Sequence, residues 1–318
     1  MRGRRGTAVA TALLGAALAT AGCGLGAGAD VGTVELTVTR DYGATPMLQR
    51  SVQARESDTV MRLLEGEAGI ETRYGGGFVH AIEGVEEQAG GDGPYDWFFY
   101  VDGVESPIGA AEVELEGGER VWWDYRDWSA TNHVPAVVGS WPAPFAAGVG
   151  GKSYPVVVEC REGGAACELA REAPELEGVE LASGFPKGAI RVLVGPWQRL
   201  RTDATAKLIE GGPAESGVFV DFRAGVRPLS PMGRQRTNAD FELVALDEEG
   251  EAAAGLGPDA GLVAATSRYG GPPVWVVTGG TAAGVQAAAK ALDATSLRDH
   301  YAVAIEGGTA TPLPLEAR

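Results

Sequence analysis

Residues 95–103 read YDWFFYVDG, and residues 117–128 read GGERVWWDYRDW. The first segment ends in Asp-Gly, a pair that readily forms two-residue hairpin turns, so it predicts a strand that leads into a hairpin. The second segment predicts another strand of the same sheet. The stretch from residue 97 to residue 128 holds four of the seven Trp residues of the chain, and this concentration of rings decides how the fold is interpreted.

Successive side chains of a strand point to opposite faces of its sheet, so both strands place rings on both faces. One helix is predicted nearby, at about residues 58–67, and one helix covers one face. We therefore expect some rings to remain exposed and to form a binding surface bordered by Asp and Arg. The alternative is that the rings are core packing, because large rings are usually well buried. The candidate ligand contacts are Trp97, Phe99, Tyr100, Trp122, Trp123 and Tyr125.

Further elements are predicted ahead of these strands. Residues 34–39 alternate apolar and polar side chains, which is the pattern of a half-buried strand. Residues 58–67 carry apolar residues at helical spacing, with Ser57 or Asp58 as the N-cap. Residues 78–82 predict another strand. The N-terminal block, residues 33–128, is thus expected to be a small α+β domain with one helix.

The order of these motifs along about residues 31–128 resembles a bacterial family of small domains similar to the C-terminal β-domain of transcobalamin and intrinsic factor. The motifs are TVMRLLE, YGGGFVHAIEGV, DWFFYVDGVESPIGA and LEGGERVWWDYRDW. The resemblance implies a mixed β-sheet with one helix, in which the two aromatic strands contact the ligand. In transcobalamin-type proteins this domain closes over one face of cobalamin, and a helical barrel supplies the rest of the cavity. The composition of this chain leaves no room for such a barrel.

The N-terminus predicts export and lipid anchoring. Residues 1–22 combine early Arg residues with a short apolar stretch, as a secretory signal peptide does. They lead into LATAGC, which resembles the lipobox of bacterial lipoproteins and implies a lipid on Cys23. The usual pattern has Leu where this chain has Thr20, and the alternative is a plain signal peptide that leaves a free thiol. Residues 23–32 are rich in Gly and Ala and predict a flexible tether.

The other two cysteines, Cys160 and Cys167, flank the Gly-rich loop REGGAA. In an oxidising compartment this spacing predicts a local disulfide. A metal site is the alternative, but a structural metal needs about four ligands, and neither His nor a further Cys lies nearby in the sequence. We expect neither a metal nor a catalytic cofactor.

The chain then changes in character. Residues 129–152 are rich in Pro, Gly and small apolar residues and predict a linker. Residues 153–318 predict an α/β domain, because apolar strands alternate with helical segments. Residues 274–294 place a helix N-terminus after a strand and two glycines, which is an anion site in principle. The glycines match no phosphate-binding motif, so we interpret this segment as a tight turn. We assign the C-terminal block to no family.

Composition argues against several classes of function. The chain has 318 residues, with 26 Lys and Arg against 43 Asp and Glu, so its formal charge is −17. This balance disfavours nucleic-acid binding, which requires a positive surface. His80, His133 and His300 lie in no nucleophile or metal motif, and Gly-x-Ser-x-Gly is missing. We therefore expect that the protein is not an enzyme.

The sequence predicts a bacterial lipoprotein held on the extracytoplasmic face of the cell membrane. Its aromatic strands would capture a small cyclic ligand, with a corrinoid such as cobalamin as the candidate, and deliver it to a transporter component. The alternative is a structural or protein-interaction lipoprotein of the envelope without a small-molecule ligand, because the chain lacks the barrel that would supply the other half of a ligand pocket.

Overall fold

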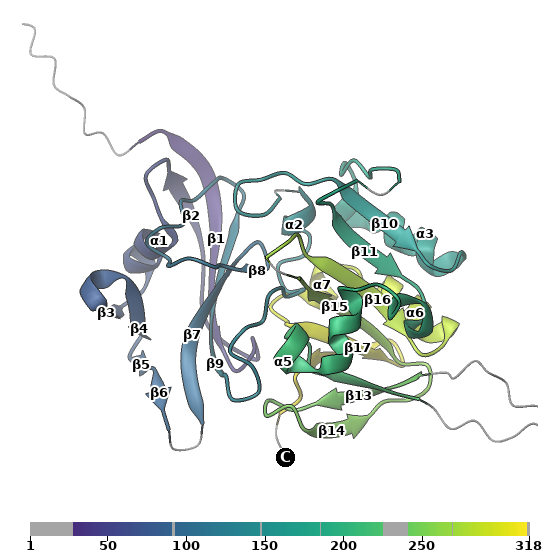
Figure 1. Ribbon diagram of the computed structural model, residues 1–318. Coiled ribbons are helices and arrows are strands. Elements are labelled where there is room, and N and C mark those ends of the chain that lie inside the picture. Colours follow the sequence, from purple (N-terminus) through teal and green to yellow (C-terminus); the bar gives the residue numbers. More distant parts are fainter. Residues whose placement is uncertain are drawn as a thin grey trace, which may run out of the picture.

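The computed structural model describes residues 28–316 except 91–92, 147, 185, 225–240 and 269. The predicted signal peptide, Cys23 and half of the predicted tether therefore lie outside the described residues. The described part is β-rich, with two six-stranded sheets, two three-stranded sheets and few helices (Figure 1). No helix among these residues has both the length and the apolar character that crossing a membrane requires.

The first six-stranded sheet, which we call the N-terminal sheet, contains both aromatic strands (Figure 1). Its strands lie in the order β2-β1-β9-β7-β6, and β8 pairs with β7. β1 and β9 are parallel, while the other neighbours are antiparallel. The strands are β1 (Asp30–Arg40), β2 (Thr45–Arg55), β6 (Gln88–Ala89), β7 (Pro94–Val101), β8 (Val104–Glu105) and β9 (Arg120–Asp127).

The hairpin predicted from the Asp-Gly pair is present between β7 and β8. Asp102 and Gly103 both have left-handed backbones, with φ of 50° and 79°, as a two-residue turn of this kind requires. β2 was not predicted. It lies at the edge of the sheet, and most of its residues are exposed or half-buried, so its sequence does not alternate between a buried and a solvated face.

One face of the N-terminal sheet is covered by α1 (Val60–Glu67) and by a three-stranded sheet. That sheet consists of β3 (Ile70–Arg73), β4 (Phe78–Ile82) and β5 (Val85–Glu86), and the 3-10 turn η1 (Tyr74–Gly76) joins β3 to β4. The helix begins after Thr59, whose side chain accepts a hydrogen bond from the Arg62 amide at 3.3 Å. The predicted helix is therefore present, but the predicted N-caps, Ser57 and Asp58, were wrong.

The opposite face of the N-terminal sheet lies against the C-terminal block (Figure 1). This block contains a six-stranded sheet in the order β10-β11-β16-β15-β17-β18 and a three-stranded sheet in the order β12-β13-β14. β10, β11 and β16 run parallel, but the remaining pairs are antiparallel, so the predicted α/β pattern describes only part of the block. The strands are β10 (Val156–Cys160), β11 (Ile190–Val194), β12 (Val220–Ala224), β13 (Phe241–Leu246), β14 (Ala252–Gly255), β15 (Gly261–Thr266), β16 (Val274–Gly279), β17 (Ala302–Glu306) and β18 (Thr309–Leu313).

The helices of the C-terminal half are short. α3 (Ala165–Arg171) and α6 (Ala282–Lys290) pack on the face of its large sheet that points away from the N-terminal sheet. The Asp203 carboxylate accepts hydrogen bonds from the Thr205 and Ala206 amides at the start of the 3-10 helix η3 (Ala206–Gly211). The other helices of the described residues are α2 (Ala143–Ala146), which precedes the C-terminal block, and η2 (Pro174–Leu176), α4 (Trp197–Leu200), η3 (Ala206–Gly211), α5 (Pro213–Ser216) and α7 (Ala294–Leu297).

The glycines between β16 and α6 are explained by close packing. A β-carbon at Gly280 would collide with the backbone carbonyl of Phe241, and one at Gly284 would collide with that of Ala260. The α6 N-terminus is already capped, because the Thr281 hydroxyl accepts the Gly284 amide at 3.2 Å. This turn therefore offers little for an anion to bind.

Residues 129–152 were predicted as a linker, but much of this segment is buried. Trp141 and Phe145 pack against Trp275 of β16, with ring centroids 5.4 and 5.1 Å apart. The blocks on either side share one hydrophobic cluster, in which Tyr42 and Trp122 meet side chains from β11 to β17. The chain from β1 to β18 thus packs as a continuous structure.

Candidate functional site at the aromatic strands

The six candidate rings form three cross-strand pairs between β7 and β9. The pairs are Trp97 with Tyr125, Phe99 with Trp123, and Tyr100 with Trp122. Their ring centroids are 5.2, 4.8 and 5.7 Å apart, respectively. Rings at these distances attract one another and stabilise neighbouring strands.

The rings that face α1 are covered by the small sheet and the helix. Trp97 is 6% exposed, Trp123 3% and Tyr125 9%, while Phe99 is half-buried. The indole NH of Trp97 and the hydroxyl of Tyr125 donate to backbone carbonyls of β5 at 3.0 and 2.8 Å. Their polar atoms are thus used within the domain, and these rings contribute to the core.

The other face carries Tyr100 and Trp122, which are fully buried. Tyr301, from the loop that precedes β17, packs against both, with ring centroids 5.6 and 5.3 Å away. The expectation of exposed rings was therefore wrong for five of the six candidates. One helix covers one face, as predicted, and the C-terminal block covers the other. The exposed ring of this region is Trp128, at 39%.

A buried polar network joins the two blocks around Asp124. Its Oδ1 accepts hydrogen bonds from the Thr39 hydroxyl at 2.5 Å and the Gly43 amide at 3.1 Å, and its Oδ2 accepts the Tyr301 hydroxyl at 3.0 Å. The Trp122 indole NH donates to the Thr39 oxygen at 2.8 Å. Burial raises the pKa of Asp124 to about 6, although these hydrogen bonds act to lower it.

Arg126 lies beside this network and is also fully buried. Its guanidinium carbon is 3.7 Å from the centroid of the Phe98 ring, which is cation–π geometry. Its Nη1 donates to the carbonyls of Asp127 and Thr131 at 3.2 and 2.9 Å. Since Thr131 belongs to the segment after β9, the guanidinium holds that segment against the sheet.

The histidines lie at three separate places. His80 is buried with Glu86 and Glu87 within 3.6 and 3.3 Å. His133 is 2.6 Å from a Glu105 carboxylate oxygen, and this hydrogen bond raises the pKa of His133. Burial lowers the pKa of His300. In the part of the chain that the structure describes, no group of three His, Cys, Asp or Glu side chains is placed to hold a metal ion.

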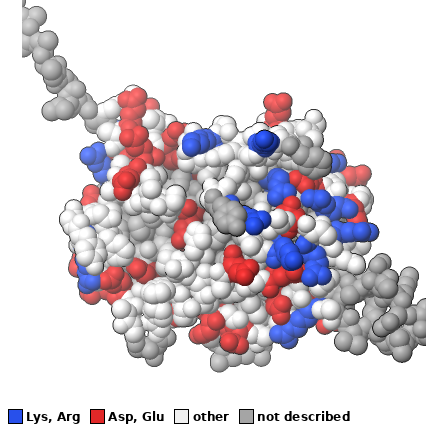
Figure 2. Space-filling model, viewed as in Figure 1, with Lys and Arg blue, Asp and Glu red and all other residues white. Residues whose placement is uncertain are grey.

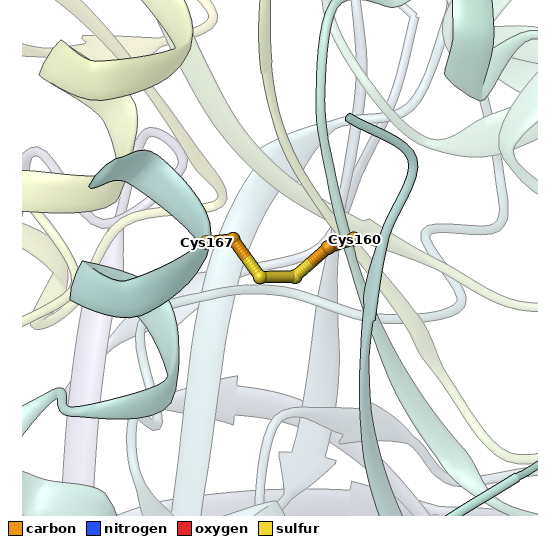
Figure 3. The surroundings of a disulfide bond; sticks show 2 residues. All are labelled: Cys160 and Cys167. Carbon is orange, nitrogen blue, oxygen red and sulfur yellow. A yellow bond between two sulfur atoms is a disulfide. The ribbon is translucent and has the colours of Figure 1, made fainter. Parts of the chain in front are cut away.

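The predicted disulfide between Cys160 and Cys167 is confirmed (Figure 3). It joins the end of β10 to α3, with the two Cα atoms 5.7 Å apart. The bond closes the REGGAA loop beside the large sheet of the C-terminal block.

A groove beside the β7–β8 hairpin was not predicted; we call it the acidic groove. It has a volume of about 680 Å³ and lies between the hairpin, the loop at 105–116 and the turn at 149–152. Apolar side chains of Val101, Val104 and Leu115 contribute to its lining. Its carboxylates belong to Glu56, Glu105, Glu112, Glu114 and Glu116. The sequence signal was the run EVELE at 112–116, which alternates acidic and apolar residues.

Residues 57–127 match the model of a family described as a domain of unknown function (DUF4430). This family is transcobalamin-like, so the predicted resemblance is confirmed over these residues. The match includes α1, both aromatic strands and most of the acidic groove, and it does not reach the C-terminal block. No curated protein matches the chain.

Proposed function

We propose that this protein is a lipid-anchored interaction protein of the bacterial cell envelope, which binds a partner protein through its surface. The observation that carries the proposal is that both faces of the aromatic sheet are covered. Because five of the six candidate rings are buried in the protein's own cores, a flat ligand finds little ring surface on which to stack. The remaining surface carries charge (Figure 2) and a groove, and surface charge steers the encounter with a partner of opposite charge.

The anchor is supported by the signal-peptide pattern and by LATAGC, which places Cys23 at the predicted lipidation point. β1 begins at Asp30, which is seven residues after Cys23. A chain of seven residues spans at most about 25 Å. An anchored body would therefore stay close to the extracytoplasmic face of the membrane. The acidic charge of the chain would keep it from lying flat on anionic lipid.

Capture of a corrinoid for a transporter is the second candidate function. It is favoured by the transcobalamin-like match at residues 57–127. Stacking on Tyr100 or Trp122 would require the two blocks to separate, since Tyr301 lies against both rings. Stacking on the other face would require α1 or the small sheet to move. Both movements remove apolar side chains from a core, which opposes binding.

Calorimetric titration of the mature protein with cyanocobalamin and cobinamide distinguishes the two functions. We expect no saturable heat up to millimolar corrinoid, because neither ring face is free. Saturable binding at micromolar corrinoid would overturn the proposal in favour of the second candidate.

Acrylamide quenching of tryptophan fluorescence provides an independent measurement. Trp128 is the one exposed indole among the described residues, so acrylamide should quench a minor share of the emission. A Trp128→Phe variant serves as the matched control and should lose most of the quenchable share. Strong quenching that persists in this variant would mean that the buried rings are accessible.

A further inference from the structure

One wall of the acidic groove is the segment 112–116, which leaves a turn at Glu112 and runs alongside the start of α1 around Glu114. The Leu115 amide donates to the Asp58 carbonyl, and the Val60 amide donates to the Val113 carbonyl, both at 3.0 Å. These two hydrogen bonds hold the segment against the start of α1 in an antiparallel bridge. The wall is therefore fixed by backbone contacts.

This wall displays carboxylates at every second residue. Glu112, Glu114 and Glu116 are exposed, whereas Val113 is half-buried and Leu115 is buried. In an extended chain, residues two apart are separated by about 6.7 Å along the strand. Glu114 and Glu116 thus have about that spacing, and Glu112 precedes them in the turn; we call these three carboxylates the row.

The groove has an unbalanced negative charge. Glu105 is paired with His133, but no ion pair within the described residues involves Glu56 or the three carboxylates of the row. Lys152 is the cation of the lining. The charges of the whole surface are also unevenly distributed. In Figure 2, acidic side chains predominate over the N-terminal block, at the left, and basic side chains gather over the C-terminal block.

The floor of the groove is apolar. Val101 and Leu115 are buried there, and Val104 is half-buried. At the rim, Ile108 is 48% exposed, which is unusual for a large aliphatic side chain. The volume of about 680 Å³ lies within the range of pockets that hold ligands. The site therefore combines spaced negative charge with apolar contact surface.

We propose that the acidic groove binds an extended basic segment of a partner protein, in which Lys or Arg alternates with apolar residues. An extended peptide also spaces the side chains of one face by about 6.7 Å, so two of its cations match Glu114 and Glu116 and the next is directed toward Glu112. Its intervening apolar side chains meet the floor. A metal ion is a poorer occupant, since no group of three described carboxylates is placed to hold one. This inference rests on the proposed interaction function and names the chemistry of the partner.

Two fluorescein-labelled hexapeptide amides of equal composition test the spacing, KVKVKV and KKKVVV. Fluorescence anisotropy is measured at 150 mM salt, where the Debye length is about 8 Å and the overall charge of the protein is largely screened. We expect the alternating peptide to bind about tenfold more tightly, because three exposed ion pairs of a few tenths to one kcal/mol each act together. Equal affinities, or no binding of either peptide, would overturn the proposal.

Matched charge variants test the place of binding. The groove variant is E112Q/E114Q/E116Q, and the control is E172Q/E177Q/E180Q, which neutralises three exposed carboxylates of the C-terminal block. We expect the groove variant to lose about tenfold in affinity for KVKVKV and the control to keep it. Equal losses would show general attraction between opposite charges and refute the assignment.

Two competing occupants are tested in the same assay. Spermine that displaces KVKVKV as well as unlabelled peptide does would show that a small polycation suffices, and would overturn the peptide assignment. A dimer in sedimentation velocity that the groove variant abolishes would assign the groove to a second copy of this chain. The corrinoid titration tests the proposed function, and the peptide assay tests the acidic groove. A failure of the peptides to bind would therefore overturn the groove assignment without changing the result of the titration.

Discussion

Replacing Asp124 by Asn removes an ionisable group that the fold buries completely, and we expect it to change how stability depends on pH. The side chain lies where the two blocks meet, and Thr39, Gly43 and Tyr301 donate hydrogen bonds to it. An Asn side chain has the same shape and can still accept from Thr39 and Gly43 through its oxygen. The Tyr301 hydroxyl can rotate to accept from the new amide, so the variant should fold.

The magnitude follows from the pKa of Asp124, which burial raises from the ordinary value of 3.8 to about 6. A carboxyl with a higher pKa in the folded protein binds its proton more tightly there. Its contribution to stability is fully present below about pH 4 and is lost as the pH rises through about 6. A pKa difference of about two corresponds to about 3 kcal/mol, of which about 2 kcal/mol is lost between pH 4 and pH 8.

Urea unfolding of the wild type and of Asp124→Asn at pH 4, 6 and 8 measures this effect. The free energy of unfolding of the wild type should fall by about 2 kcal/mol more than that of the variant between pH 4 and pH 8. The variant should keep a slope of the same sign, because the pKa values of Asp102 and Glu248 are also raised by burial, each to about 7. Identical pH dependence in both proteins would refute the assignment of a buried, ionisable Asp124.

Three further perturbations test the packing and the anchor. The C160S/C167S variant should lose about 2.5 kcal/mol in urea unfolding, because its denatured chain is no longer closed into a loop; equal stability would contradict this. Gly280→Ala should lower the midpoint of thermal unfolding by many degrees or prevent folding, since the new β-carbon would collide with a β13 carbonyl. Gly66→Ala is the control: nothing lies near its new β-carbon, so the midpoint should be unchanged or higher. Cys23→Ser should abolish incorporation of labelled palmitate in a bacterial host and release the protein from membranes; retained label would disprove the lipobox interpretation.

The local elements of the N-terminal block could be predicted because their patterns are strong. β7 and β9 are dense in aromatic residues, and the turn at Asp102 and Gly103 needs residues that tolerate a left-handed backbone. α1 has a buried stripe at helical spacing. Each of these signals is contained within about ten residues, so no long-range contact is needed to interpret it.

β2 was missed, and the burial of residues 129–152 was not predicted, because the environment of both segments depends on the rest of the fold. β2 is an edge strand that is solvated on most positions, so the period-two pattern is weak. Residues 129–152 have the Pro and Gly content of a linker, yet Trp141 and Phe145 pack into the core of the large C-terminal sheet. A high Pro and Gly content predicts turns, but it does not predict whether other parts of the protein bury those turns.

The same reasoning explains what was missed at the site. Alternation showed that β7 and β9 carry rings on both faces, but it could not show what lies over the second face. Tyr301 covers that face. The Tyr100 hydroxyl donates a hydrogen bond to the Tyr301 hydroxyl at 3.2 Å, although 201 residues separate the two in the sequence. The acidic groove carried a local signal, the alternation at 112–116, but only the structure brings Val101 and Lys152 to the same place.

These contacts determine which part of the molecule is left for recognition. The transcobalamin-like match ends at residue 127, before any residue of the C-terminal block that covers Tyr100 and Trp122. A sheet with aromatic side chains on both faces is stable in water only when both faces are covered. The C-terminal block therefore completes the N-terminal sheet in the place where a ligand would otherwise stack. The acidic groove lies at the margin of that sheet, outside the shared core, so a partner can reach it without separating the two blocks.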